Sequence, residues 1–112
     1  MNTKKTEFER PPDCFSLSGV RMGFLAVHIS PSSVAKELDA LYYVTKECEN
    51  FANTPNLVLL GDMNADCSYL TKQARDKLLL RTDKQYEWRI TDTMDTTVAP
   101  KPCAYDRLVA VL

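Results

Sequence analysis

The sequence predicts an α/β protein with a mixed sheet, and three neighbouring segments carry this prediction. Residues 20–29 are apolar and β-prone, the apolar positions after Val34 recur every three to four residues, and residues 57–60 are wholly apolar. A strand, a helix and a second strand in this order form a βαβ-like step, which is typical of sheets covered by helices. We expect one domain over residues 1–112, because no linker or internal repeat divides the chain.

The first half of the chain contains the clearest elements. Residues 1–19 are polar and include Pro11-Pro12, so we expect an irregular lead-in there. The strand over residues 20–29 stops at Ser30-Pro31-Ser32-Ser33, a sequence that favours a helix cap. The helix ends near Asn53, because Pro55 restrains the preceding residue away from helical angles. Its apolar face comprises positions 34, 38, 41, 44 or 45, 48 and 51.

The second half continues the alternation of strands and helices. Residues 57–60 predict a strand covered on both faces, residues 71–80 a helix, residues 86–90 a strand around Trp88, residues 91–102 a polar loop, and residues 104–112 a last strand. This last strand ends on apolar residues beside the terminal carboxylate, whereas charged termini belong in water. We therefore expect the chain to be cut short of a complete fold.

Charge and hydropathy exclude several classes of protein. Lys and Arg number 14 and Asp and Glu 15, a net charge of −1, so any contact with nucleic acid must be local. The basic residues between Lys72 and Lys84 are interrupted by aspartates, and a solvated amphipathic helix explains them at least as well as a nucleic-acid site. No apolar run approaches the ~20 residues of a membrane-spanning helix, and no apolar stretch follows the positive first residues as in a signal peptide.

A carboxylate and a carboxamide follow the second strand directly. Asp62 and Asn64 stand in Gly61-Asp62-Met63-Asn64, just past residues 57–60. Held at the rim of a sheet, they can present oxygen to a hard cation and an amide N–H to a phosphate oxygen, as magnesium-assisted phosphoryl chemistry requires. Gly-Asp and Asn are also common in turns, and a plain turn explains the motif equally well.

His28, the only histidine, ends the first strand and has two interpretations. It can donate a proton to a phosphate, or orient it, if a carboxylate sets its tautomer, and Asp106 at the start of the last strand is a candidate for that carboxylate. The alternatives are a hydrogen-bonded core histidine and, for Asp106, a turn cap or a strand-edge pair with Arg107. Spacing leaves these alternatives open.

Four cysteines allow three complete pairings. None stands in a CxxC motif, so zinc-binding and thioredoxin-like functions have weak support. A disulfide or simple burial is the better explanation. Cys48 lies on the apolar face of the predicted helix and is most simply a buried small hydrophobe.

Three motifs carry a resemblance to a known family. The run Gly61-Asp62-Met63-Asn64-Ala65-Asp66-Cys67-Ser68-Tyr69, the segment Asp95-Thr96-Thr97 and the run Cys103-Ala104-Tyr105-Asp106-Arg107 resemble the deoxyribonuclease I family of the endonuclease/exonuclease/phosphatase superfamily. The resemblance extends through the whole chain, including Phe8-Glu9-Arg10 and the strand that ends in His28. It implies a partial four-layer α/β/β/α sandwich and a metal-dependent endonuclease that cuts DNA phosphodiester bonds with an activated water.

The resemblance also implies a role for individual residues. It makes His28 one of two catalytic histidines and Asp106 the aspartate that pairs with the other. It implies Asp62 and Asn64 as magnesium and phosphate ligands, Arg10 and Tyr105 as DNA contacts, Asp95 and Thr97 as a structural calcium loop, and Cys67 with Cys103 as a disulfide. Cys14 and Cys48 have no counterpart in the family pattern.

The departures from the family pattern limit what the isolated chain can do. The second histidine and the glutamates of the family's N-terminal half have no match, Pro11 replaces a usual glutamate, and Lys101 puts a positive charge where a calcium ligand is expected. We expect the chain alone to be inactive. The alternatives are a non-catalytic binding or regulatory fragment that self-associates through an uncovered sheet face, or another phosphoesterase of the superfamily. The family is typically secreted or held in the secretory pathway.

Overall fold

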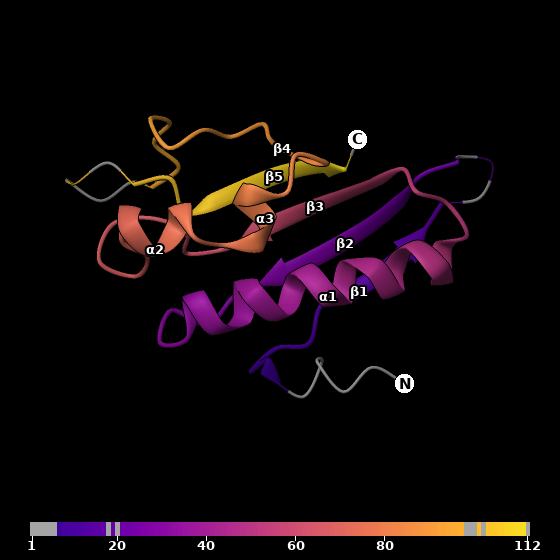
Figure 1. The fold of residues 1–112 in the computed structure, drawn as a ribbon, viewed down its shortest axis with the longest axis horizontal. Coiled ribbons are helices and arrows are strands. Elements are labelled where there is room, and N and C mark those ends of the chain that lie inside the picture. Colours follow the sequence, from indigo (N-terminus) through magenta and orange to yellow (C-terminus); the bar gives the residue numbers. More distant parts are fainter. Residues whose placement is uncertain (1–6, 18, 20, 98–100, 102, 112) are drawn as a thin grey trace.

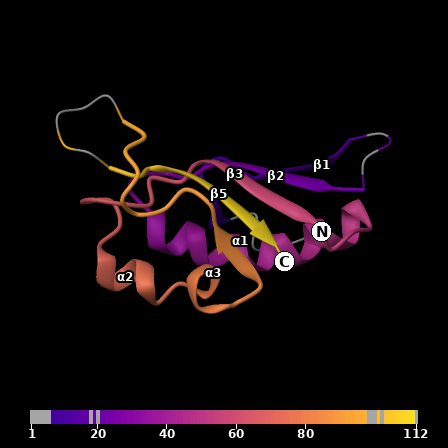
Figure 2. The ribbon, with the colours of Figure 1, turned by 90° about the horizontal axis from the view of Figure 1, so that it is seen from above.

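The computed structural model describes residues 7–17, 19, 21–97, 101 and 103–111, and in them a five-stranded sheet carries helices on one face (Figures 1 and 2). Val20, residues 98–100, Pro102 and Leu112, to which some predictions extend, lie outside these residues. The elements are β1 (Asp13–Ser16), β2 (Gly23–His28), α1 (Val34–Ala52), β3 (Leu57–Asp62), α2 (Lys72–Asp76), α3 (Leu79–Thr82), β4 (Tyr86–Trp88) and β5 (Asp106–Val111).

The sheet is mixed, with strand order β1-β2-β3-β5-β4. β2 and β3 run parallel and are joined by α1, which confirms the predicted strand, helix and strand. The other three neighbouring pairs are antiparallel. The α/β class is therefore confirmed, whereas the described residues form only two layers, and the four-layer sandwich stays a prediction.

Helix α1 packs its apolar face against the sheet. It begins at Val34 after Ser33, whose side chain makes no capping hydrogen bond, and ends before Asn53, which adopts the left-handed conformation and donates its N–H to Glu49 O. The predicted apolar positions are buried as far as Cys48, but Phe51 is 73% exposed, so its assignment to the buried face is wrong. Facing α1 are buried strand residues that alternate along each strand: Leu25, Val27, Leu57, Leu59, Val109 and Val111.

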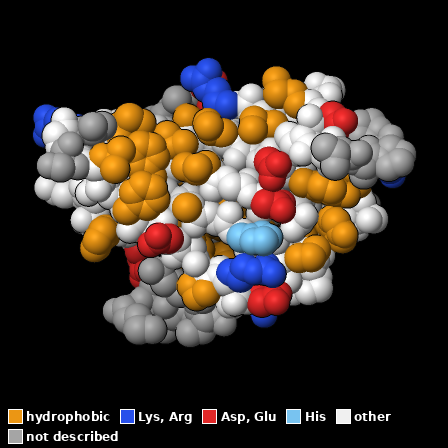
Figure 3. All heavy atoms as spheres, turned by 180° about the vertical axis from the view of Figure 1, so that it is seen from behind, with side chains coloured by type: hydrophobic (Ala, Val, Ile, Leu, Met, Phe, Trp, Pro, Cys, Tyr) orange, Lys and Arg blue, Asp and Glu red, His pale blue; other side chains and the backbone are white. Residues whose placement is uncertain are grey.

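The opposite face of the sheet carries no helix in the described part of the chain (Figure 2). Its apolar side chains are partly exposed, and Figure 3 shows hydrophobic side chains gathered on this face beside the histidine. We call this surface the open face; its apolar residues are Phe15, Phe24, Ala26, Val58, Leu60, Leu108 and Ala110. The prediction that residues 57–60 are covered on both faces is therefore wrong for Val58 and Leu60.

Two other predictions need correction. Residues 13–16 are not an irregular lead-in but form the edge strand β1, which the sequence hides because only one of its four residues is a large hydrophobe. The single helix expected over residues 71–80 is two short helices, because Leu78 between them is extended. No helix among the described residues is long and apolar enough to cross a membrane.

Both disulfides join segments that lie far apart in the sequence. The predicted Cys67–Cys103 bond is present, with a Cα to Cα distance of 6.0 Å. Cys48 is buried as predicted but is not simply a small hydrophobe, because it is bonded to Cys14 with a Cα to Cα distance of 5.7 Å. This second bond attaches β1 to α1, and sequence reasoning found no partner for either cysteine.

Candidate functional site

Three polar side chains lie in one row at the end of the sheet. His28 ends β2, Asp62 ends β3 and Asp106 begins β5, and in the sheet register His28 pairs with Asp62 and Asp62 with Asp106. Paired residues of neighbouring strands point to the same face, so all three side chains emerge on the open face. Figure 3 shows the histidine with acidic side chains directly beside it. The structure thus brings together three predicted site residues that lie far apart in sequence.

Asp62 is the central member of the row. Its Oδ2 lies 3.8 Å from His28 Nε2, longer than a hydrogen bond, and both side chains are about half exposed. Burial raises the pKa of Asp106 above its usual value, and the negative charge of Asp62 adds to this increase. A hydrogen bond with Thr96 and the nearby His28 act in the opposite direction. The row therefore combines an accessible imidazole with two carboxylates that interact electrostatically.

Gly61 makes the conformation before Asp62 achievable. Its φ is +138°, and a Cβ at this position would lie 2.0 Å from the carbonyl oxygen of Val27. Only glycine tolerates both conditions. The close approach of β2 and β3 therefore requires the glycine of Gly61-Asp62-Met63-Asn64, and Gly61 and Asp62 belong to strand β3 rather than to a turn.

Asn64 is fixed next to Asp62 by hydrogen bonds. Its main-chain N–H donates to Asp62 Oδ1 at 3.0 Å, and its side-chain Nδ2 donates to Ile29 O at 2.8 Å. The residue is buried and adopts a positive φ of 47°. Because Nδ2 is engaged by the neighbouring strand end, Oδ1 is the atom of Asn64 that can act as a ligand.

The described residues do not contain a dense metal centre. No group of three or more His, Cys, Asp or Glu side chains lies close enough there to hold a metal ion. Asp62 and Asn64 supply one carboxylate and one amide oxygen, a donor set that suits a magnesium ion keeping most of its waters. The residues therefore fit weak magnesium binding and give no support for a tightly held ion.

The remaining predicted residues lie around this row in different ways. Tyr105 precedes Asp106 in the chain, and its carbonyl oxygen accepts the N–H of Met63 at 3.0 Å. Asp95 Oδ1 accepts the N–H groups of Thr97 at 2.9 Å and Cys103 at 3.3 Å, so one oxygen of the expected calcium ligand is used within its own loop. Arg10 is exposed.

Thr96 was missed by sequence reasoning. Its Oγ1 accepts the main-chain N–H of Asp106 at 3.1 Å. The loop between β4 and β5 thereby touches the site through Thr96, which lies between the two residues predicted to bind calcium. The one feature of the sequence that could have pointed to Thr96 is its position in the Asp95-Thr96-Thr97 motif.

Arg107 was also missed. Its guanidinium donates to Ala104 O at 2.7 Å, Ile90 O at 2.9 Å and Ala65 O at 3.0 Å, and Nη1 lies 2.8 Å from Asp92 Oδ1. The alternative of an Asp106–Arg107 strand-edge pair is therefore wrong.

Asp66 connects the segment after β3 with the segment before β5. Its Oδ2 accepts the N–H of Ala104 at 2.9 Å and its Oδ1 accepts Nη1 of Arg75 at 2.9 Å. Arg75 is buried, so the explanation of residues 72–84 as a solvated helix is wrong for this residue. Together with Cys67–Cys103, these bonds hold the segment after β3 against the segment before β5. The segments that position Asp62, Asn64 and Asp106 are therefore bonded to one another.

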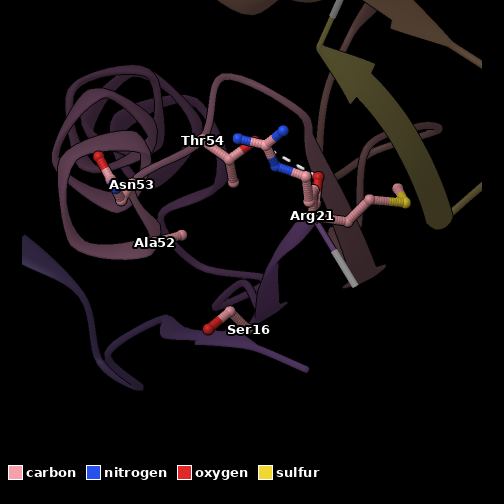
Figure 4. Close-up of a pocket in the computed structure, with 6 residues that line it drawn as sticks. Ser16, Arg21, Ala52, Asn53 and Thr54 are labelled. Atoms are coloured by element: carbon pink, nitrogen blue, oxygen red, sulfur yellow. Dashed lines mark hydrogen bonds between the residues drawn. The ribbon is translucent and has the colours of Figure 1, made fainter. Parts of the chain in front are cut away.

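A separate pocket lies at the other end of the sheet. It has a volume of about 200 Å³ and is lined by residues from the end of β1, the segment before β2 and the end of α1, as Figure 4 shows. Its lining contains no carboxylate, and the hydroxyl of Thr54 donates to Arg21 O at 3.4 Å across it. Because β2 leads from this end to His28, the pocket is not part of the site.

Comparison with known proteins places most of the chain in one group. No family model matches the chain. It is 50% identical over 84 residues to Deoxyribonuclease-1-like 1 of Chlorocebus aethiops and 49% identical over 84 residues to the Homo sapiens protein of that name, in each case over 74% of this chain and 28% of the relative. It is 39% identical over 85 residues to Deoxyribonuclease-1 of Bos taurus, over 76% of this chain and 30% of that protein. The chain thus spans less than a third of the length of these curated relatives.

Proposed function

Because the chain belongs to the deoxyribonuclease I family, of whose curated members it spans less than a third, we propose that it carries part of the catalytic site of a divalent-metal-dependent endonuclease that hydrolyses phosphodiester bonds of DNA. The observation that supports this function most strongly is the row of His28, Asp62 and Asp106 on the open face. Three unrelated segments deliver these chemically active groups to one sheet end.

Asp62 and Asn64 are the proposed ligands of magnesium. The carboxylate of Asp62 provides the charge, and Oδ1 of Asn64 provides a neutral oxygen whose position is set by the bond from Nδ2 to Ile29 O. When bound, such an ion neutralises phosphate charge and lowers the pKa of a coordinated water. Calcium binding by Asp95 and Thr97 is proposed on the family resemblance alone.

His28 and Asp106 are the proposed catalytic residues. His28 is accessible and lies 3.8 Å from a carboxylate, an arrangement suited to moving a proton at a phosphate oxygen. Asp106 would orient a second imidazole that this chain does not supply, since His28 is its only histidine. Arg10 and Tyr105 are the proposed contacts to the DNA backbone.

The chain lacks the second histidine and the glutamates of the family pattern, and we therefore predict that it has no nuclease activity alone. Loss of a general base typically costs on the order of 10² to 10⁴ in rate, so the 112-residue chain should show no measurable nicking of supercoiled plasmid with magnesium and calcium. Manganese, as a paramagnetic substitute, should still broaden the ring resonances of His28, and Asp62→Ala should abolish the broadening. Metal-dependent nicking that disappears in Asp62→Ala would contradict the predicted inactivity, and no broadening in the unchanged chain would contradict the metal site.

A non-catalytic role as a binding or regulatory fragment is the second candidate, and the open face favours it. A partly exposed apolar sheet surface is covered in most soluble proteins, and self-association through this face is the partner contact that we propose. Another phosphoesterase activity would be recognised by cleavage of a small phosphate ester without cleavage of duplex DNA. Two disulfides favour an oxidising compartment for either role.

A further inference from the structure

Glu37 is a buried carboxylate that the proposed chemistry does not use. It lies in the first turn of α1 and is only 1% exposed. Its Oε1 accepts the main-chain N–H of Ser30 at 2.9 Å, and its Oε2 accepts the main-chain N–H of Glu9 at 3.2 Å. Among the ion pairs of the described residues none includes Glu37. Main-chain donors therefore satisfy both carboxylate oxygens near the N-terminal end of the helix.

The two N–H groups belong to segments that carry proposed site residues. Ser30 follows His28 by two positions, and Glu9 directly precedes Arg10. Phe8 and Pro12 are buried on either side of Arg10, which is itself exposed. One carboxylate thus connects the segment of Arg10 with the end of β2.

We propose that Glu37 is a positioning residue: by bridging the N–H groups of Glu9 and Ser30, it holds Arg10 beside the His28 end of the sheet, where a DNA phosphate would lie. The DNA contact of Arg10 is part of the proposed function, and the inference rests on it to that extent. An arginine held in place before binding loses less conformational freedom when it contacts a phosphate.

The chemistry of the carboxylate suggests a variant of nearly equal shape. A glutamine has one carbonyl oxygen and one NH₂ group, so Glu37→Gln must turn a donor toward one of the two N–H groups. One of the two bridging bonds is then lost. Glu47→Gln is the matched control, because Glu47 lies on the same helix and is exposed.

The first arm of the test needs no DNA. Amide hydrogen exchange and ¹⁵N relaxation are measured on the full chain and on both variants. In Glu37→Gln the amide of Glu9 or Ser30 should exchange about tenfold faster, and the Arg10 amide should become more mobile, whereas β3 amides such as that of Leu59 keep their rates. Unchanged exchange at Glu9 and Ser30, or unchanged relaxation at Arg10, would overturn the proposal. If Glu37→Gln does not fold, Glu37→Asp is measured in its place.

The second arm measures binding of a fluorescein-labelled DNA duplex against salt concentration without metal. Loss of one phosphate contact should lower the slope of log affinity against log salt by about 0.9. Arg10→Gln, Glu37→Gln and the double variant should all show this same decrease, and Glu47→Gln none. Independent, additive losses in the double variant would overturn the proposal. If the unchanged chain does not bind DNA, the proposed function fails, and the exchange and relaxation data still decide the role of Glu37.

Discussion

Asp106 and Arg107 are neighbours in the chain, yet their side chains leave β5 on opposite faces of the sheet. Asp106 shares the open face with Asp62, whereas the side chain of Arg107 is fully buried on the covered face. One strand therefore serves two purposes: a polar residue faces the site, and the next residue binds the main chain of the segments that support it.

Replacing Arg107 should destabilise the fold severely. Arg107→Met leaves three carbonyl oxygens without their donor and Asp92 without one of its three arginine partners, and removal of one member of a buried charged network typically costs about 3 to 5 kcal/mol. The decrease is measured by urea unfolding followed by the fluorescence of Trp88. Arg89→Met is the control, because Arg89 forms an exposed pair with Glu87 and should change stability by less than about 1 kcal/mol. Similar losses in the two variants would contradict the role of Arg107.

Gly61→Ala should destabilise through a backbone collision. The new Cβ would meet Val27 O at 2.0 Å at a positive φ, so we expect a loss of about 2 to 5 kcal/mol in the free energy of unfolding. Gly19→Ala is the matched control, because Gly19 also has a positive φ but no atom lies within 4 Å of the position that a Cβ would take there. Its loss should be about 1 kcal/mol. Equal losses in thermal or urea unfolding would show that the close approach of β2 and β3 does not restrict this position.

The stability contribution of Asp66 should depend on pH in a defined direction. Burial alone would raise its pKa, but hydrogen bonds from the N–H groups of Ala104 and Cys67, together with Arg75, hold the pKa below its usual value. A depressed pKa in the folded state stabilises the fold above the unfolded pKa of about 3.9, and this stabilisation is lost as the pH falls through the folded value.

Urea unfolding at pH 6 and at pH 3 tests this direction. Asp66→Asn should lose about 1 to 3 kcal/mol at pH 6, and the difference from the unchanged chain should shrink at pH 3. Asp39→Asn, at an exposed position of α1, should show neither effect. A difference that is constant or grows toward low pH would contradict the predicted sign.

The parts of the fold predicted from sequence are those in which local pattern and tertiary packing agree. The strand before His28, the helix from Val34 and the strand from Leu57 have apolar periodicities that match the faces they bury. β1 has no such periodicity. Its pairing with β2 and the bond from Cys14 to Cys48 hold it in place instead. Periodicity also could not show that one face of the sheet is open, since Val58 and Leu60 look like core residues.

The sequence predicted the site residues whose side chains have recognisable chemistry. It did not predict the buried charged residues that hold the neighbouring segments in place. His28, Asp62, Asn64 and Asp106 have side chains with recognisable chemistry at strand ends. Arg107 and Glu37 are charged residues that a sequence assigns to the surface by default. Their burial depends on main-chain groups from distant segments, which no local pattern reports. The alternation of faces along a strand was the available signal against pairing Asp106 with Arg107.

Each disulfide should contribute to stability to a similar extent. The bonds close loops between cysteines 34 and 36 positions apart, for which the chain-entropy model gives about 3 to 4 kcal/mol each. The double variants Cys14→Ser/Cys48→Ser and Cys67→Ser/Cys103→Ser should therefore show comparable decreases in urea unfolding. Thiol titration of the unfolded, unreduced chain should detect no free thiol. Two reactive thiols that map to Cys14 and Cys48 would contradict the second bond.

Self-association should depend on where an apolar side chain lies, not on how exposed it is. Leu108 is 36% exposed on the open face, and Phe51 is 73% exposed near the end of α1. If the open face mediates contact, the mean mass from light scattering should rise with concentration for the unchanged chain and for Phe51→Glu, and Leu108→Glu should lower it, because a charge cannot be buried there without a partner. A chain that stays monomeric at every concentration would contradict the contact, and a larger effect of Phe51→Glu would move it to the helical side.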